Sequence, residues 1–507
     1  MIDKGTFKRL VAPAAVGAIG LVALGSVGAA GQFLLRLSTG GATTQALQEV
    51  PELPADADLV AEWAPDAWDG ERALEPATRR RIEAAYVRAI GALGRYGATG
   101  DASGIEDNFA GPAMRAAIEL PMQEATALWS VSHRLRLDLY SLDGRTAVIT
   151  DTAAEIVRST RSGDRDTLIS VTERYEVVLV LEEGTWLVRQ LRRVAGDAPV
   201  IVSRGTDADG RATTLVDGLE PAPASGPVPR LRGAGYRPAA APFELQWATF
   251  DAGRARADLG RLAALGLDSV RAHLPFAAIG GAEPNADALD DLRTFLDLAD
   301  EHGLGVVLTL FDDRTDHTPN SWTADDHHLR AVAAAVGDHP ALVMWDLGDS
   351  PDLATATASP AEIRARLVHL VSTLRAADPI TPITITWSSP EVAADPGMAR
   401  FVDAVSFRWS GDAHGLADAV AGLRAVVGGR PLIVGAYGTH SWDGPLPNGR
   451  TEDDQAEATA AVLRTIRELD LAGAFARSLY DLAVAPGGSP IPRPWVSGPA
   501  THIGLLR

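Results

Sequence analysis

The sequence contains no cysteine, and its basic residues are outnumbered by its acidic ones. Without thiols the chain can form no disulfide framework, no thiolate metal site and no thiol nucleophile. The chain has 46 Lys and Arg against 66 Asp and Glu, which gives a formal net charge of −20. Because nucleic acids attract basic surfaces, this balance argues against a nucleic-acid partner.

One long uncharged run lies near the start of the chain. Leu10 to Leu35 carries no charged side chain and follows Lys4, Lys8 and Arg9. About 26 residues rising 1.5 Å each exceed the roughly 30 Å apolar core of a bilayer. We therefore expect residues 1–36 to form a single-pass transmembrane anchor in the cell membrane. The basic residues predict a cytoplasmic N-terminus, so the bulk of the chain would be extracytoplasmic.

A cleaved signal peptide and a buried hydrophobic helix are the alternatives to this anchor. The small residues Gly28, Ala29 and Ala30 offer a cleavage site. The run Phe33-Leu34-Leu35 continues the apolar stretch beyond that point. This continuation favours an anchor that is not cleaved.

The first part of the chain after the anchor predicts a tether and a small α+β domain. Residues 37–76 are rich in Ala, Pro, Asp and Glu without periodicity, as in a tether. Residues 79–96 have the apolar spacing of a helix, which Gly97 closes. Four alternating stretches predict strands at 131–142, 145–158, 166–181 and 185–194, with hairpin turns at Asp143-Gly144 and Glu183-Gly184.

A helix followed by a long antiparallel meander resembles the nuclear transport factor 2-like (SnoaL-like) fold, an α+β cone, over residues 77–195. The resemblance lies in this pattern and carries no motif. Domains of that family bind small ligands in the cone, dimerise, or space other domains. Because no acid–base pair is convincingly placed, the sequence favours a structural or interaction role. Residues 196–238 gather Gly, Pro, Ala and Ser and predict an interdomain linker.

Residues 239–507 alternate short apolar strands with amphipathic helices, which is the pattern of a parallel sheet. Seven helices are expected, at 254–265, 286–302, 325–336, 360–377, 391–399, 416–427 and 452–469. The strands are expected to end near Trp247, Leu274, Phe311, Leu347, Trp387, Arg408, Ala436 and Leu479. This pattern and length fit a (β/α)8 TIM barrel of about 250 residues.

The last helix of such a barrel is not evident, since Gly504-Leu505-Leu506 is followed only by Arg507. An apolar groove between the last and first strands would then be exposed. We expect the linker, the N-terminal domain or a cell-envelope protein partner to cover it.

The stretch Ala341 to Asp352 ends an apolar run in Trp-x-Leu-x-x-x-Pro. It resembles the fourth barrel strand of clan A (cellulase-like) glycoside hydrolases, whose motif reads Trp-x-Leu-x-Asn-Glu-Pro and whose Glu is the proton donor. Trp345, Leu347 and Pro351 match the motif. Asp349 stands in place of the Asn, and Ser350 stands in place of the Glu.

Other strand ends extend the resemblance over most of residues 243–507. The phrase LAALGLDSVRAHLPF resembles the second strand and retains, as Arg271, the arginine that holds the family's nucleophile. RPLIVGAYG resembles the seventh strand, but Ala436 replaces the nucleophilic Glu. Arg408-Trp409 replaces a frequent His-Tyr on the sixth strand, and Arg477 stands where a sugar-stacking Trp is common.

The two replacements remove the groups that retaining hydrolysis needs. That chemistry uses two carboxyl groups about 5–5.5 Å apart, one as acid and one as nucleophile. Ser350 supplies no acidic proton and Ala436 no nucleophile, so we predict no catalytic residue at these positions. Relocated acids stay open as an alternative, because inverting enzymes use carboxyls about 6.5–9.5 Å apart. Asp349 with Asp312 or Asp313 is the best pair for that role.

The strand ends also predict a ligand cleft. Tryptophans there could stack on sugar rings, although core packing is the simpler role for such residues. No histidine spacing supports a metal site, and no cofactor is predicted. The candidate cleft residues are Trp247, Arg271, His273, Asp312, Asp313, Trp345, Asp349, Ser350, Trp387, Arg408, Trp409, Ala436, Tyr437, His440, Arg477 and Asp481.

Three functions follow from this sequence. The resemblance and the lost glutamates favour a membrane-anchored pseudoenzyme that binds a polysaccharide or oligosaccharide, or aids polysaccharide export or assembly. An active glycoside hydrolase with relocated Asp residues is the second. A scaffold for protein contacts in a cell-envelope complex is the third.

Overall fold

The computed structural model describes residues 60–118, 127–162, 165–206, 210–238, 247, 249–441, 449–481 and 504–506. The predicted anchor at 1–36 and most of the tether lie outside these residues. In the described ranges, no helix is both long enough and apolar enough to cross a membrane.

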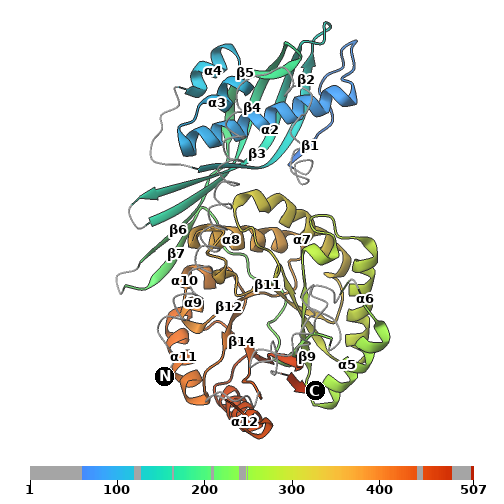
Figure 1. The fold of residues 1–507 in the computed structure, drawn as a ribbon, viewed down its shortest axis with the longest axis vertical. Helices are drawn as coiled ribbons and strands as arrows, with labels where there is room; N and C mark the ends of the chain where they lie inside the picture. Colours follow the sequence, from blue (N-terminus) through green and yellow to red (C-terminus); the bar gives the residue numbers. More distant parts are fainter. Residues whose placement is uncertain are drawn as a thin grey trace, which may run out of the picture. The chain divides into compact units, whose positions relative to one another are not determined.

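The first part of the described chain is an α+β domain in which α2 packs against a sheet that is antiparallel apart from the parallel pair β1–β2 (Figure 1). Its sheet has the order β1-β2-β3-β4-β6-β7, and β5 also pairs with β4. The helices are α2 (Pro76–Thr99), α3 (Ser103–Asn108) and α4 (Gly111–Ile118). The strands are β1 (Ala61–Trp63), β2 (Ala127–Tyr140), β3 (Thr146–Ser162), β4 (Arg165–Glu182), β5 (Thr185–Gly196), β6 (Val200–Thr206) and β7 (Ala212–Asp217).

The helix and the four long strands predicted here are present, for the reasons that the sequence suggests. Ile82 and Tyr86, at helical spacing, are 0% exposed and face the sheet. The β4–β5 hairpin turns at Glu183 and Gly184, whose φ angles of 49° and 86° are both left-handed. Positive φ at both central residues matches the twist of paired strands. Likeness to the nuclear transport factor 2-like fold stays a prediction.

The prediction of a linker at 196–238 is wrong, because these residues contain the strands β6, β7 and β8 (Leu231–Tyr236). The last of these is the first strand of the barrel, which is therefore not the stretch ending at Trp247. The glycines of β8 make this strand hard to recognise in the sequence. A Cβ on Gly233 would lie 2.4 Å from the carbonyl oxygen of Ser269, and a Cβ on Gly235 would lie 2.6 Å from the carbonyl oxygen of Arg477. A strand that passes so close to its neighbours needs glycine and lacks the usual apolar run.

The rest of the chain forms a closed barrel of eight parallel strands surrounded by helices (Figure 1). After β8 its strands are β9 (Ser269–Leu274), β10 (Gly305–Leu310), β11 (Leu342–Asp349), β12 (Ile383–Trp387), β13 (Val405–Trp409), β14 (Leu432–Tyr437) and β15 (Gly473–Ala476). β15 pairs with β8 and closes the ring. The TIM-barrel prediction is confirmed in this respect, and β9 to β14 end within two residues of the positions predicted from the sequence. The last predicted end, Leu479, is a correction, because β15 ends at Ala476 and Leu479 lies in the separate strand β16 (Ser478–Tyr480).

The helices of the barrel also lie where periodicity predicts them, except that the one short helix expected at 391–399 is divided into two. They are α5 (Ala252–Ala264), α6 (Ala286–Glu301), α7 (Trp322–Val336), α8 (Pro360–Ala377), α9 (Pro390–Ala393), α10 (Pro396–Ala399), α11 (Ala413–Val427) and α12 (Glu452–Glu468). Short 3-10 turns are η3 (Ala277–Ile279), η4 (Pro319–Ser321) and η5 (Pro351–Leu353). Side-chain caps begin several helices, as in the Ser359–Glu362 capping box of α8.

The final segment of the barrel is described only in part. β16 (Ser478–Tyr480) pairs in parallel with β17 (Gly504–Leu506). Residues 482–503 lie outside the described residues, so the missing eighth helix and the covered groove stay predictions.

Polar contacts join the α+β domain to the helices of the barrel. Asp395, 1% exposed, accepts hydrogen bonds from the backbone N–H (2.9 Å) and hydroxyl (2.6 Å) of Thr214 and pairs with Arg204 and Arg364. A Cβ on Gly397 of α10 would lie 1.6 Å from the Thr214 carbonyl oxygen. The two backbones therefore meet at a point where only glycine fits.

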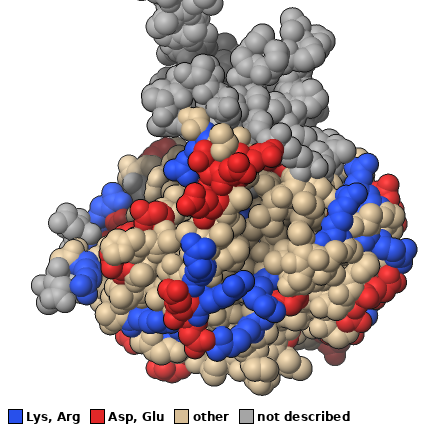
Figure 2. Space-filling model, turned by 90° about the horizontal axis from the view of Figure 1, so that it is seen from below, with Lys and Arg blue, Asp and Glu red and all other residues tan. Residues whose placement is uncertain are grey.

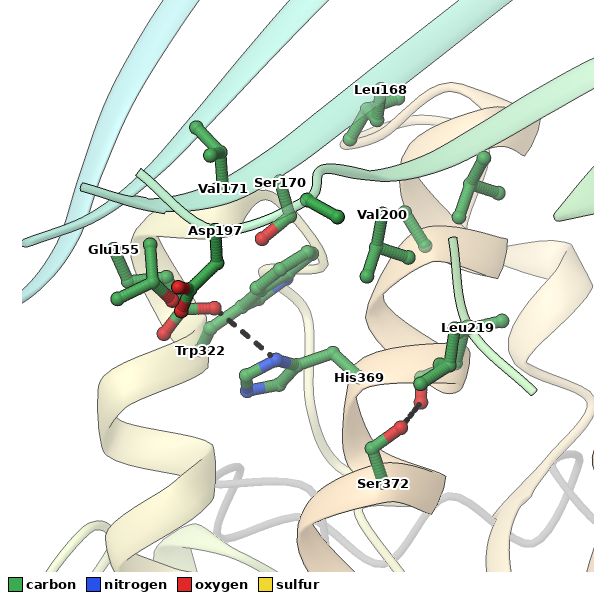
Figure 3. A pocket seen from close by; sticks show the side chains of 15 residues that line it. Glu155, Leu168, Ser170, Val171, Asp197, Val200, Leu219, Trp322, His369 and Ser372 are labelled. Atoms are coloured by element: carbon green, nitrogen blue, oxygen red, sulfur yellow. Dashed lines mark hydrogen bonds and ion pairs between the residues drawn. The ribbon is translucent and has the colours of Figure 1, made fainter. Parts of the chain in front are cut away.

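A second contact between the two domains surrounds a cavity of about 260 Å³ (Figure 3). Trp322 of α7 stacks on His369 of α8, with ring centroids 4.4 Å apart. His369 Nε2 lies 2.9 Å from Asp326 Oδ1, and its Nδ1 lies 3.5 Å from the Glu155 carboxylate of β3. Burial opposes charge on the imidazole, but these carboxylates outweigh it and raise the pKa of His369 to about 9.

The surface charge is mixed in the view that faces α12. Figure 2 shows basic and acidic side chains interspersed over this face. Exposed ion pairs among the described residues include Arg230–Asp470 and Arg256–Glu301. Such pairs contribute little to the free energy of unfolding, so they do not determine the fold.

Candidate functional site

The candidate site lies at the carboxyl ends of the barrel strands, where parallel strands present their following residues to a common mouth. A cavity of about 330 Å³ opens there. Among the described residues, it is lined by Ser350, Leu353, Ser388, Arg408, Trp409, Ser410, Ala436 and Arg477. The two positions that the motifs assign to the lost glutamates, Ser350 and Ala436, thus line one cavity.

Arg271 of β9 lies at the floor of the mouth and is 3% exposed. Its Nη2 donates to Asp346 Oδ2 at 2.6 Å, and its Nε donates to the Thr309 hydroxyl at 2.9 Å. Its Nη1 lies 3.4 Å from Asp349 Oδ2 and 3.2 Å from the carbonyl oxygen of Gly435. Burial opposes the charge, but the nearby carboxylates outweigh it and raise the pKa of Arg271.

Asp349 closes β11 and stays ionised. Its Oδ1 accepts a hydrogen bond from the Ser350 hydroxyl at 3.1 Å and lies 3.6 Å from Arg408 Nη1. Burial would raise the pKa of Asp349, but Arg271 and Arg408 outweigh it and hold that pKa at about 2. A carboxyl with such a pKa cannot serve as a general acid near neutral pH.

The backbone at Ser350 is in the left-handed region, with φ 63° and ψ 47°. Phe311, at the end of β10, has a φ of 62°. Non-glycine residues adopt this conformation at a cost, and such residues cluster at functional sites. The mouth therefore carries backbone strain on two neighbouring strands.

Two carboxylates, Asp312 and Asp349, lie next to each other at the ends of β10 and β11. Asp312 Oδ1 accepts a hydrogen bond from the backbone N–H of Asp349 at 2.9 Å, and its other oxygen pairs with His273. Atoms of His273, Asp312 and Asp349 lie within 4.8 Å of one another and could in principle hold a metal ion. Because Arg271 and Arg408 already pair with Asp349, their positive charges oppose a cation there. The group is better described as an ion-pair network.

Several arginines accompany these carboxylates at the mouth. Arg237 follows β8 and interacts electrostatically with Asp312, Asp349, Arg271 and Arg408. Arg477 follows β15 and faces Arg408, Asp349 and Arg237 in the same way. We refer to Arg237, Arg271, Arg408 and Arg477 as the mouth arginines.

Several predicted cleft residues are core residues instead, which corrects the prediction for them. Trp247, Trp345 and Trp387 are 3%, 0% and 2% exposed. Trp345 Nε1 donates to Asp378 Oδ2 at 2.8 Å, and Trp247 Nε1 donates to the carbonyl of His273 at 2.7 Å. Their large apolar area is used in packing. Trp409, half-buried, is the described tryptophan that lines the cavity.

The remaining predicted residues have structural partners or lie beside the cavity. Asp313 accepts hydrogen bonds from the backbone N–H groups of Phe276 (2.6 Å) and Ala277 (2.8 Å), and so caps η3. Asp481 accepts one from Gly504 at 2.9 Å. Tyr437 is 5% exposed, and burial raises its pKa to about 12. His440 follows β14 and is half-buried.

Sequence reasoning missed several residues of the mouth. Arg237 went unnoticed because its strand was read as a linker; recognising β8 would have placed it like Arg271. Thr309, Thr386 and Ser406 form hydrogen bonds beneath the mouth: Thr386 Oγ1 donates to Asp346 Oδ2 at 2.8 Å and lies 2.9 Å from Ser406 Oγ. Ser388 and Ser410 line the cavity. Each follows or lies on an apolar strand, which is the signal that could have found it.

A second buried polar group lies in the α+β domain, where the sequence indicated no acid–base pair. His133 of β2 pairs with Asp151 of β3 through Nδ1 and with the Ser130 hydroxyl through Nε2. The Tyr86 hydroxyl donates to Asp151 Oδ2 at 3.0 Å. Asp151 Oδ1 accepts backbone N–H groups of Arg134 and Ala153, beside bulges in β2 and β3. We call Tyr86, Ser130, His133 and Asp151 the His133 cluster.

Comparison with solved structures finds glycoside hydrolases. A GH5_18 protein from Streptomyces cattleya in complex with GlcNAc is 19% identical, covers 56% of this chain and 76% of its own, and has a TM-score of 0.46. The exo-β-1,4-mannosidase Op5Man5 from Opitutaceae bacterium strain TAV5 is 18% identical over 60% of this chain and 57% of its own (TM-score 0.45). A Bifidobacterium dentium β-glucuronidase complexed with coumarin-3-O-glucuronide is 17% identical over 75% and 63% (TM-score 0.42). No family model and no curated protein matches the chain.

Proposed function

We propose that this chain is a non-catalytic, glycoside-hydrolase-like protein that binds a polysaccharide or oligosaccharide at the barrel mouth. One observation supports it above the others: none of the described residues that line the mouth cavity carries a carboxylate. The lining instead offers three serine hydroxyls, two guanidinium groups and the ring of Trp409. Hydroxyls and an aromatic ring suit sugar binding, whereas glycoside hydrolysis needs a pair of carboxyl groups facing the bond.

The proposal includes a location. The uncharged run at 10–35 supports a single-pass anchor that holds the barrel outside the cell membrane. There a saccharide-binding barrel would aid polysaccharide export or assembly in the cell envelope, with a protein partner that covers the barrel between its last and first strands.

Isothermal titration of the full-length chain against envelope and exopolysaccharide fragments tests the binding claim. We expect saturable binding that Trp409→Ala weakens about tenfold, because the aromatic stacking surface is lost. Trp68→Ala, which removes a half-buried ring from the α+β domain, is the matched control and should leave affinity unchanged. Absence of binding across the whole set would refute the proposal.

Hydrolysis by relocated acids is the second candidate, favoured by the closeness of Asp312 and Asp349. Turnover of aryl glycosides and oligosaccharides distinguishes it. We expect none, because Asp349 is held ionised and paired. Turnover that Asp349→Asn abolishes would establish an active hydrolase and overturn the non-catalytic claim.

A scaffold is the third candidate. Recovery of the same envelope proteins from membranes, with and without added glycan, would favour it over saccharide binding.

A further inference from the structure

The mouth arginines are unequally satisfied. All three guanidinium nitrogens of Arg271 have oxygen partners within 3.4 Å. Among the described residues, Arg408 makes polar contacts only through Nη1, at 3.4 Å to Ser350 Oγ and 3.6 Å to Asp349 Oδ1. Arg477, which is exposed, makes no side-chain hydrogen bond or ion pair within the described ranges. Two arginines of this cluster therefore retain donors that can bind a ligand.

Arg408 and Arg477 line the same cavity, so their positive charges act on each other there. Partial burial, then the charges of Arg408 and Arg237, lower the pKa of Arg477. Like charges held together in a concave site repel each other more strongly than in open water. An anion between them would convert this repulsion into attraction.

The chemistry of the lining identifies the kind of anion. A guanidinium is a planar fork of donors that matches the oxygens of a carboxylate or phosphate two at a time. Ser350, Ser388 and Ser410 add hydroxyls from the ends of β11, β12 and β13, and Trp409 adds an apolar ring. Hydroxyl and ring contacts suit the uncharged part of a sugar.

We propose that the barrel mouth selects acidic saccharides and binds their anionic group, a carboxylate, phosphate or sulfate, between Arg408 and Arg477. The inference rests on the proposed saccharide binding and adds the substrate class. It also explains why a chain with a net charge of −20 has arginines at this mouth. A chain with this net charge does not attract a polyanion as a whole, so the arginines of the mouth must recognise the anionic group directly.

Titration of the full-length chain with matched ligand pairs tests this inference. Each pair has the same linkage and length: a uronic-acid trisaccharide against its neutral hexose trisaccharide, and a sugar phosphate or sulfate against the free sugar. We expect at least about tenfold tighter binding of one acidic member than of its neutral partner. The preference should shrink between 50 mM and 500 mM salt because charge contacts are screened. Which acidic member binds best identifies the anionic group.

Variants locate the anion site. Arg477→Gln combined with Arg408→Gln should remove the preference, so that the acidic and neutral members of a pair bind with affinities within about twofold of each other. Arg477→Lys keeps the positive charge but loses the planar pair of guanidinium donors, and should remove only part of the preference for the acidic member. Arg230→Gln, at the opposite end of the barrel strands, is the matched control and should change nothing. Because Arg477 is exposed, its variants should fold, and a thermal unfolding midpoint near that of the parent chain verifies this.

The outcomes separate this inference from the proposed function. Equal affinity for acidic and neutral partners would overturn the inference and leave saccharide binding intact. A preference that survives the double Gln variant would show that the anion site lies elsewhere. No binding of either partner would refute the proposed function itself.

Discussion

The His133 cluster and the mouth arginines are both groups of polar and charged side chains, but they differ in how many of their hydrogen-bonding groups have partners within the protein. In the His133 cluster, Asp151 is 0% exposed and accepts hydrogen bonds from a tyrosine, a histidine and two backbone N–H groups. At the mouth, Arg477 has no such partner within the described residues. A charge network that is complete stabilises its surroundings, whereas one with unused donors is available to a ligand. Removing or adding single charges tests this difference.

The largest effect is expected from breaking the complete network. Asp151→Ala leaves His133, the Tyr86 hydroxyl and two bulge N–H groups without their acceptor. We expect the free energy of unfolding to fall by about 3–5 kcal/mol. Urea denaturation measures it, and Asp107→Ala, at an exposed position of α3, is the control. A loss below about 1 kcal/mol would mean that the cluster is not a stabilising unit.

His369 offers a network that pH can break. Its pKa is raised from 6.5 to about 9 in the folded protein. A group whose folded pKa is raised contributes its full stability below pH 6.5, and that stability is lost as pH rises through 9. We expect a fall of about 3 kcal/mol over this interval.

His369→Gln should flatten this part of the pH profile of unfolding free energy. The control is His414→Gln, because His414 is an exposed histidine of α11. A profile for His369→Gln as steep as that of the parent chain would contradict the assignment.

Ala436→Glu should complete the network at the mouth. The new carboxylate would lie next to Gly435, whose carbonyl already accepts Arg271, and in the cavity lined by Arg408 and Arg477. We expect about 1 kcal/mol greater unfolding free energy and about tenfold weaker binding of acidic saccharides. Ala421→Glu, on the exposed face of α11, controls for added charge. Unchanged acidic-saccharide affinity would contradict the comparison.

The smallest effect is expected from relieving the repulsion at the mouth. Arg477→Gln should raise the unfolding free energy by about 0.3 kcal/mol in low salt, because Arg477 is exposed and its interactions are screened. The gain should vanish at high salt. A loss of stability on the same substitution, measured by denaturation at both salt concentrations, would show that Arg477 has a stabilising partner.

Sequence reasoning located most of the barrel but only part of its mouth. Strands ending near Leu274, Phe311 and Leu347 were evident because their apolar runs are bounded by helices. β8 was not evident, because close packing against β9 and β15 requires Gly233 and Gly235, and small residues also mark linkers. Arg237 was lost with it. Resemblance to a motif identified Arg271, Ser350 and Ala436.

Burial could not be predicted for the tryptophans. Trp345 and Trp409 both end or approach the end of a strand, yet one is 0% exposed and the other is half-buried. This difference in exposure depends on the side of the barrel wall to which each side chain points. It also depends on Asp378, which accepts a hydrogen bond from the Trp345 ring. Those are tertiary facts that local pattern does not contain.

The contact between Gly397 and Thr214 has a consequence for unfolding. The two residues lie on different domains, and the backbone of one occupies the space that any side chain at 397 would need. Together with the buried Asp395 beside them, this makes the sheet and the barrel mutually dependent. Such dependence favours cooperative melting, so calorimetry of residues 59–507 is expected to show one endotherm with a van't Hoff enthalpy equal to the calorimetric one.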